Sequence, residues 1–462
     1  LQGQLGGVAQ PVISHETGQW CAYPDFAVID KFAGRGDYAA FHTGIDTGTA
    51  PYMIPGNIEI MRDFAAEHGL LPLNRQLAHA SGRFQLACYK EEIEANLRTP
   101  SHSGFQMLDL HDYLGQGGAL IGLLDAFWEE KAYVAAPEWR EFCSATVPLV
   151  RLKDRVFRSD ATLEAAAELY HHGERPLRAV RPRWHIVDDA GTAVLSGTLP
   201  TRAAPRGKGI ALGTITADLS GLKAPAAYEL VLELAGTPFR NRWRFWVYPP
   251  AAPAAAAPDI ITTTSWSEAR AALAAGRRVL FLSGNPVQPN PDLALTTVPI
   301  FWNRLMNPSR AWMVGLWCDA PHPALAGFPT EAHCDWQWVD LLRDTTAMNV
   351  EALPPGLRPI VQPIDDWNRS LRTAMLFEAQ VGPGTLMASA FDLTEGALAG
   401  RPGGSTLRGS ILDYMASDRF HPAMALAPEA LDGWAGQRHD APATIIVPPQ
   451  TGDVVDPGQV RR

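Results

Sequence analysis

A run made only of proline and alanine divides the sequence at residues 249–258. Such a run has few side chains that can bury apolar surface, and it behaves as a semi-stiff spacer rather than as part of a core. The 462 residues are enough for several domains, each with its own core. We therefore predict separately folded units on the two sides of a linker at 250–258.

The segment 151–249, before this linker, has a two-residue periodicity. Asp188–Gly191 carries the signal of a hairpin turn within it. Several short strands within about 100 residues predict an immunoglobulin-like β-sandwich. Apolar and polar side chains alternate over residues 161–169, 183–189, 227–234 and 241–248.

Residues 1–150 have a different order of elements. Short β-prone runs at 12–15 and 104–110 flank two segments with helical apolar spacing, 57–68 and 84–98. Strand, helix, strand order predicts an α/β unit, and we interpret 1–150 as the C-terminal part of a (β/α)8 barrel.

The sequence after the linker predicts another α/β domain, at 259–435. A helix at 267–275 leads into an apolar strand at 277–284, and a helix at about 405–417 closes the domain. We expect the Pro/Gly-rich tail, 436–462, to be loosely ordered. The further strands are predicted at 311–317, 359–364, 373–379 and 384–390.

Composition excludes several classes of function. The net charge of −10 argues against a general nucleic-acid binder, which needs a basic face. We expect no membrane anchor, because no run approaches the roughly 18 apolar residues that span a bilayer. The five cysteines are scattered without a CxxC pair, so we predict no metal site and no cofactor.

One candidate catalytic residue follows the first strand. Glu16 stands at the end of Pro11–Glu16, after His15 and before Gly18. Active sites of β/α barrels are built at the C-terminal ends of the strands. A retaining glycosidase uses one carboxylate there as nucleophile and a second, about 5 Å away, as acid/base. The alternative is a glutamate that only caps the strand or forms an ion pair.

Polar side chains also cluster after the second strand, in a turn rich in glycine. Planar polar groups and aromatic faces are the residue types that bind sugars, although a solvated turn and packed aromatic rings would give the same pattern. The turn matches neither GxxxxGK[ST] nor GxGxxG, so we do not predict a phosphate site. The polar candidates are Asp109, His111, Asp112 and Gln116, and the aromatic candidates are Trp20, Tyr23 and Trp128.

The two strand ends together resemble the last barrel strands of family 2 glycoside hydrolases. In that family a strand of the form (K/R)PV(I/L)xxE ends in the nucleophile, and a strand of the form GGFxWDxxDQ lines the sugar site. Pro11–Glu16 is similar to the first form, and Gly104–Asp109 to the second, with Leu108 in place of the tryptophan. The likeness extends over most of residues 10–420 and is strongest to a bacterial subgroup described as family 2 sugar-binding proteins.

The resemblance implies a periplasmic or extracellular enzyme that hydrolyses terminal β-linked sugars through Glu16 as nucleophile. It implies substrate contacts by His15, Trp20, Tyr23, Asp109, His111, Asp112 and Gln116. The acid/base of this family is the glutamate of an Asn-Glu pair, and the sequence contains no such pair. We therefore expect a missing N-terminal half, in the same or another chain, without which the protein is inactive. The alternative is a non-catalytic carbohydrate-binding or accessory protein.

The segment 259–435 resembles the glutamine-amidotransferase-like domains attached to some glycosidases. A Cys-His-Glu triad is not evident in it, and Cys318 and Cys334 lack the strand-to-helix elbow of a nucleophile, so we expect a structural role. An amidotransferase-like enzyme with a reactive thiol remains the alternative. Trp336 and Trp338 either stack on sugar rings or fill the seam between domains. His322, Glu331, His333 and Asp335 suggest a metal, but their spacing fits no standard zinc pattern.

Overall fold

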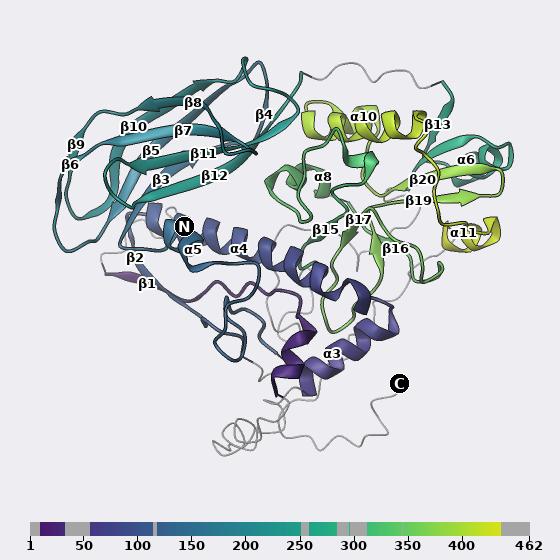
Figure 1. Cartoon of the computed structure of the whole chain (residues 1–462), viewed down its shortest axis with the longest axis horizontal. Helices are drawn as coiled ribbons and strands as arrows, with labels where there is room; N and C mark the ends of the chain where they lie inside the picture. The colour runs from purple at the N-terminus through teal and green to yellow at the C-terminus, as the bar shows by residue number, and fades with distance from the viewer. Residues whose placement is uncertain are drawn as a thin grey trace.

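The computed structural model describes residues 10–32, 56–113, 118–250, 258–283, 295, 312–343 and 345–435. Gln116, the tail 436–462 and most of the Pro/Ala linker lie outside these ranges. The described chain is a mixed α/β structure with several separate sheets, and none of them closes into a barrel. In Figure 1 a two-sheet unit lies on one side and an α/β unit on the other, and the long helix α4 (Asn74–Arg98) runs beneath both.

The first region contains a two-stranded parallel sheet and helices. Strand β1 (Val12–Thr17) pairs in parallel with β2 (His102–Met107), although about 85 residues separate them in the sequence. Helices α3 (Gly56–Glu67) and α4 lie between these strands in the sequence, and α5 (Ala136–Phe142) follows β2. The strand, helix, strand order is as predicted, but α4 begins ten residues before the predicted start of its helix.

Two sheets of the next region share one hydrophobic core. Alternate side chains of β5 (Thr162–His171) are buried, as the two-residue periodicity predicts. The three-stranded sheet has the order β10-β5-β3, and the five-stranded sheet the order β4-β12-β11-β7-β8. The other bounds are β3 (Thr146–Leu152), β4 (Val156–Arg158), β7 (Pro182–Asp188), β8 (Ala193–Thr198), β10 (Gly207–Asp218), β11 (Ala226–Leu234) and β12 (Arg240–Tyr248). A small pair, β6 (Leu177–Val180) with β9 (Arg202–Ala204), lies beside them.

The turn between β7 and β8 forms as the sequence predicts. Asp188 accepts hydrogen bonds from the backbone N–H groups of Ala190 and Thr192, at 3.0 and 2.8 Å, and Gly191 has a φ of 75°. Strand β10 was not predicted, because its glycines break the apolar alternation. The pairing of β10 with β5 shifts register near Gly207 and Gly213, as expected for bulges.

The third region is built on a six-stranded mixed sheet of order β13-β14-β20-β19-β17-β15. Strands β13, β14 and β20 pair in parallel, and the others are antiparallel. Helices α6, α10 and α11 lie around this sheet (Figure 1). The strand bounds are β13 (Ile260–Thr263), β14 (Arg278–Leu282), β15 (Leu316–Cys318), β17 (Val361–Pro363), β19 (Leu376–Val381) and β20 (Gly384–Ser389). The helix bounds are α6 (Trp266–Ala274), α8 (Val339–Leu342), α9 (Glu395–Leu398), α10 (Pro402–Ala416) and α11 (Pro428–Ala435), and β16 (Met348–Asn349) pairs with β18 (Thr373–Ala374).

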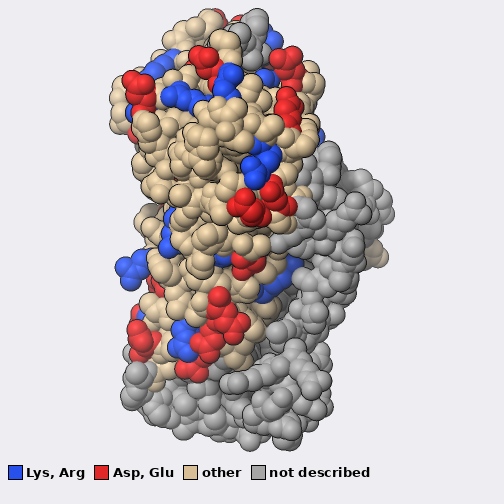
Figure 2. Space-filling view, turned by 90° about the vertical axis from the view of Figure 1, so that its right-hand side faces the viewer, with Lys and Arg blue, Asp and Glu red and all other residues tan. Residues whose placement is uncertain are grey.

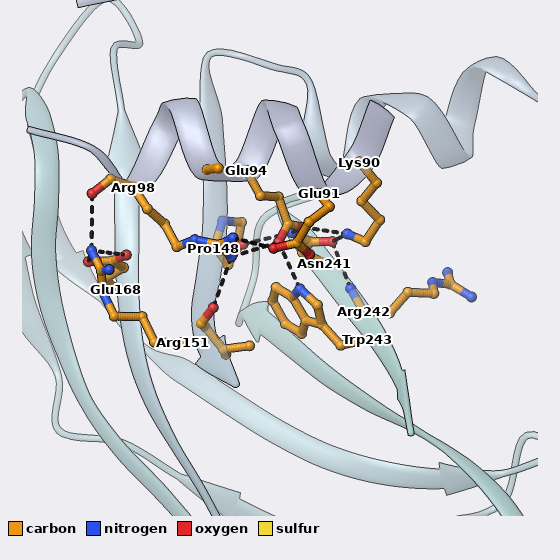
Figure 3. A network of polar contacts seen from close by, with 12 residues as sticks. Lys90, Glu91, Glu94, Arg98, Pro148, Arg151, Glu168, Asn241, Arg242 and Trp243 are labelled. Atoms are coloured by element: carbon orange, nitrogen blue, oxygen red, sulfur yellow. Dashed lines mark hydrogen bonds and ion pairs between the residues drawn. The ribbon is translucent and has the colours of Figure 1, made fainter. Parts of the chain in front are cut away.

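A buried ionic network fixes α4 to the two-sheet unit, as Figure 3 shows. Glu94 is fully buried and accepts hydrogen bonds from Lys90 and, at 3.0 Å, from Arg98. From strand β12, the Asn241 amide and the Trp243 indole donate to the same carboxylate at 2.8 and 2.9 Å. Burial by itself raises the pKa of Glu94, but the two cations outweigh it, so the pKa lies below the ordinary value.

The other end of α4 contacts the α/β unit. Ser81 is buried, and its hydroxyl donates to the carbonyl of Val314 at 2.6 Å while accepting from the backbone N–H of Tyr23 at 2.8 Å. Gly315 packs directly on the backbone of Ser81. One helix therefore connects the β1 region, the two-sheet unit and the α/β unit.

The surface mixes charges of both signs. Figure 2 shows acidic and basic side chains intermingled with neutral ones over the described part of one face. The helices within the described ranges include none that combines the length and the apolar character needed to cross a bilayer.

We predict that Glu94→Ala lowers the free energy of unfolding by about 3–5 kcal/mol, because it leaves the partly buried Lys90 without its ion-pair partner and the buried Trp243 indole without its acceptor. Urea unfolding followed by circular dichroism measures the difference. The control is Glu164→Ala on the exposed face of β5, which should change stability by less than about 0.5 kcal/mol. Similar losses in the two variants would contradict a central role for the network.

Candidate functional site

The parallel pairing of β1 and β2 brings the two predicted strand ends to one edge. Thr17 lies opposite Met107, and the N–H of Leu108 donates to the carbonyl of Thr17 at 3.2 Å. Because parallel strands end at the same edge of a sheet, Glu16 and Asp109 both reach this edge. We call it the β1/β2 edge, and its candidate residues are His15, Glu16, Asp109, His111 and Trp128.

Glu16 has an unusual backbone. Its φ is 53°, in the left-handed region that few residues other than glycine adopt, and its side chain is 47% exposed. His15 Nε2 lies 3.6 Å from Glu16 Oε1, and Gln19 donates to Oε2 at 3.2 Å. A side chain held open to solvent on a strained backbone is characteristic of functional sites.

Gly18 allows the chain to turn after Glu16. It has a φ of 77°, and a Cβ at this position would lie 2.1 Å from the ring of Tyr89. The Tyr89 hydroxyl donates to the Gly18 carbonyl, which fixes the turn on helix α4. The position of Glu16 therefore depends on a close contact that only glycine permits.

Across the edge, Asp109, His111 and Trp128 form a second cluster. Asp109 Oδ1 lies 2.7 Å from His111 Nδ1, and the His111 ring lies 4.3 Å from the Trp128 ring. Trp128 is 60% exposed and has a φ of 64°, held in a tight turn in which Asp125 accepts from two backbone N–H groups. An exposed indole beside an imidazole and a carboxylate provides an apolar face and polar groups for a sugar ring.

Two predicted substrate contacts have little exposed surface, since Tyr23 is buried and the Asp112 side chain is only 11% exposed. Tyr23 is only 3% exposed, and its hydroxyl lies 3.0 Å from the Ser370 hydroxyl of the α/β unit. Asp112 accepts from Lys131 at 2.7 Å and from the N–H of Gly122 at 3.0 Å. Burial raises the pKa of Asp112, and Lys131 opposes that shift. The polar groups of both residues are thus engaged by contacts within the fold.

Trp20 lines a different cavity, which we call the seam pocket. This pocket of about 310 Å³ lies between α4 and the segment formed by η6 (Trp336–Trp338) and α8. Trp338 is fully buried in the α/β unit, where its indole donates to Thr330 at 3.2 Å and its ring packs against those of Phe328 and Phe391. Trp336 is 37% exposed, and the Arg155 guanidinium lies 5.3 Å from its ring. The lining residues are Trp20, Phe84, Ala87, Cys88, Glu91, Glu92, Ala95, Cys334, Asp335, Trp336, Trp338, Val339 and Leu342.

The His322–Asp335 segment does not form a metal site. Within the described ranges, no group of three or more His, Cys, Asp or Glu side chains is placed to hold a metal ion. Burial, with a smaller contribution from Arg83, lowers the pKa of His333 to about 3, so this imidazole is neutral at pH 7. Glu331 forms an ion pair with Arg244 at 2.8 Å, and His322 caps a short helix by accepting from the N–H of Ala324.

Sequence reasoning missed Glu92 and Gln106. Gln106 Oε1 lies 3.0 Å from His15 Nδ1, across the β1–β2 pair. Glu92 belongs to a run of charged residues that is typical of a solvated helix face, so its sequence carries no signal of burial. The parallel pairing of β1 with β2 would have indicated Gln106, because it places this residue of β2 next to His15 of β1.

Thiol chemistry has no support in the α/β unit. Cys318 and Cys334 are buried, and burial raises the pKa of Cys334 to about 12. Burial raises the pKa of Cys318 well above its ordinary value too. The thiolate is the reactive form of cysteine, so neither residue is poised as a nucleophile.

We predict that iodoacetamide does not alkylate Cys318 or Cys334 in the native protein at pH 7.5. Peptide mass spectrometry after timed exposure measures this, and the urea-unfolded protein, in which both should react, is the control. Fast modification of either cysteine in the folded protein would revive an amidotransferase-like reading.

The backbone strain at Glu16 is also testable. We predict that the free energy of unfolding of Glu16→Gly is about 1 kcal/mol higher than that of Glu16→Ala. Glycine is the more stable variant because it adopts the left-handed conformation without strain. Both variants remove the same carboxylate, so they form a matched pair in urea unfolding. A more stable alanine variant would mean that Glu16 does not hold this conformation in solution.

Comparison with known proteins identifies two segments. Residues 161–249 match a model described as a domain of unknown function (DUF8488), and residues 260–435 match another domain of unknown function (DUF8487). No curated protein matches the chain.

Among solved structures, similar ones include two glycosidases. A β-glucuronidase from glycoside hydrolase family 2 is 14% identical, with a TM-score of 0.18, over 22% of this chain and 11% of that one. A β-glucuronidase from Parabacteroides merdae is 13% identical, with a TM-score of 0.17, over 30% and 21%. The sporulation control protein Spo0M from Bacillus subtilis is 12% identical, with a TM-score of 0.19, over 24% and 51%. The matches span about half or less of each of these proteins, and such TM-scores indicate only a weak likeness in part of the fold.

Proposed function

We propose that the β1/β2 edge is part of a retaining glycosidase site in which Glu16 is the nucleophile. The observation that carries this proposal is the exposed Glu16 carboxylate, held on a left-handed backbone at the end of a parallel strand pair. The Asp109, His111 and Trp128 cluster on the neighbouring strand end supplies groups suited to a sugar ring.

In this reaction a Glu16 oxygen attacks the anomeric carbon of a β-linked sugar. A bond forms between that oxygen and the anomeric carbon, while the bond to the leaving-group oxygen breaks. Water then attacks the same carbon, releases the sugar and restores the carboxylate. Trp128 would pack on the face of the ring, and His111 and Asp109 would hydrogen-bond its hydroxyl groups.

The reaction needs a second carboxyl group as acid/base, about 5 Å from the first. We assign none among the described residues and propose that a further polypeptide segment supplies it. On the same family resemblance, we propose that β1 and β2 belong to a larger β/α barrel. The two-sheet unit would be immunoglobulin-like, and the α/β unit would be an amidotransferase-like accessory domain without thiol chemistry.

A second candidate function is sugar binding without turnover. The contacts of the Glu16 carboxylate favour this binding function. Its neighbours are His15 and Gln19, and neither is the second carboxyl group that catalysis needs. In that case Trp128 and His111 would hold the sugar, and Glu16 would only orient it.

A covalent probe tests the catalytic proposal directly. A 2,4-dinitrophenyl 2-deoxy-2-fluoro-β-glycoside needs no general acid, because its leaving group departs as a stable phenolate, and the fluorine slows hydrolysis of the glycosyl-enzyme. We predict that one probe from a galactoside, glucoside and glucuronide set adds a single glycosyl unit to the peptide containing Glu16. Intact-mass and peptide mass spectrometry detect the product.

Glu16→Gln should abolish this labelling, and Glu67→Gln, on an exposed part of α3, should leave it unchanged. Labelling of another residue, or equal labelling of the Glu16 variant, would overturn the assignment. Saturable sugar binding without labelling, weakened at least tenfold by Trp128→Ala, would instead establish the binding function. If neither labelling nor sugar binding is observed, both functions are rejected.

A further inference from the structure

The seam pocket has the size and walls of a small-molecule site. Its volume of about 310 Å³ lies at the lower end of the roughly 300–1,000 Å³ common for ligand pockets. Trp20 comes from the turn after β1, Phe84 from α4 and Trp336 from η6, so three separate segments supply aromatic rings. The lining residues place the pocket between α4 on one side and η6 with α8 on the other.

The polar groups of this pocket are carboxylates. Glu91, Glu92 and Asp335 line it, and no lysine, arginine or histidine is among its lining residues. The charge of the Glu91 carboxylate is balanced by ion pairs with Arg98, at 3.0 Å, and Arg155, at 3.7 Å, and neither arginine lines the pocket. Asp335 accepts from the N–H of Trp336 at 2.7 Å, and arginines nearby lower its pKa against the larger effect of burial.

Glu92 is the lining carboxyl group for which the described part of the structure shows no charge interaction with a basic side chain. Burial raises its pKa, and the Trp20 indole and the Gly18 backbone N–H only partly oppose the shift. Its Oε2 atom and the Trp20 Nε1 atom beside it are buried, and neither reaches a partner with good hydrogen-bond geometry. Glu92 is half-buried and has no lysine, arginine or histidine partner among the described residues, so a bound cation would supply the counter-charge that the pocket lacks.

These features select among ligand classes. An anion would meet three carboxylates and no basic side chain. A sugar needs several hydrogen-bonding groups around its ring, whereas most of this wall is aromatic or aliphatic. A metal ion needs more ligands than one free carboxylate provides. An organic cation with apolar substituents fits both the aromatic faces, through cation–π attraction, and the uncompensated Glu92.

We propose that the seam pocket binds a small organic cation of the alkylammonium class, with Trp20, Phe84 and Trp336 around its apolar substituents and Glu92 as its counter-ion. This site is separate from the β1/β2 edge, and it does not depend on glycosidase activity. Trp20, predicted from the sequence as a sugar contact, belongs to this pocket.

Calorimetric titration with choline chloride tests the proposal, and 3,3-dimethylbutan-1-ol serves as a neutral probe of the same shape. We predict saturable binding of choline and at least tenfold weaker binding of the alcohol. Glu92→Gln keeps the side-chain size and removes the charge, so it should weaken choline binding at least tenfold without lowering the melting temperature. The matched control, Glu67→Gln, should bind choline as the wild type does.

Equal binding of choline and the alcohol would overturn the proposal, because the pocket would then recognise shape alone. Unchanged choline binding in Glu92→Gln would overturn it as well, and so would a failure to saturate at millimolar choline. Trp336→Ala provides an independent variant, and it should weaken choline binding by removing one aromatic wall. The fluoroglycoside labelling of Glu16 should be the same in all these variants, which distinguishes failure here from failure of the proposed enzyme.

Discussion

The burial of Glu94 is the constraint on which the arrangement of the molecule depends. A fully buried carboxylate is tolerated only when charges and hydrogen bonds surround it. Here two of its partners come from α4 itself and two from strand β12, so the charge is satisfied only when the helix lies on the two-sheet unit. This network adds a directional constraint to the hydrophobic packing of α4 against Phe142, Val147 and Leu149.

Fixing α4 fixes both candidate sites. Its residue Tyr89 holds the Gly18 turn and thereby the position of Glu16, while Phe84 and Glu92 face the seam pocket. Ser81, near the other end, joins the helix to the α/β unit and to the backbone of Tyr23. One short turn, residues 16–20, thus supplies Glu16 to the β1/β2 edge and Trp20 to the seam pocket, and α4 supports this turn.

The two sites differ in chemistry. The β1/β2 edge is open to solvent, with a strained glutamate and an exposed indole, and such features suit a polar ligand of several hydroxyl groups. The seam pocket is largely apolar, and its one uncompensated acceptor lies among aromatic rings. Burial therefore divides the aromatic residues that the sequence groups together, since Trp128 serves the edge, Trp20 the pocket, and Tyr23 the core.

The sequence by itself determined the local elements. Alternation predicted β5, β7, β11 and β12, the Asp188–Gly191 turn formed as its residue types require, and the polar ends of β1 and β2 were recognisable as candidates. Local patterns carry this information because they reflect periodicity and turn chemistry. Strand β10 and the start of α4 escaped prediction, because glycines and small polar residues mask the apolar pattern there.

Only the tertiary structure decided what each charged residue does. Glu91, Glu92 and Glu94 stand within four positions of one helix and look alike in sequence. The fold pairs the first with arginines, leaves the second without a counter-charge in the seam pocket, and surrounds the third with four donors. The differences between them come from partners that are distant in the sequence, which are Arg155 for Glu91, the Trp20 turn for Glu92, and Asn241 and Trp243 for Glu94. No local pattern encodes these contacts.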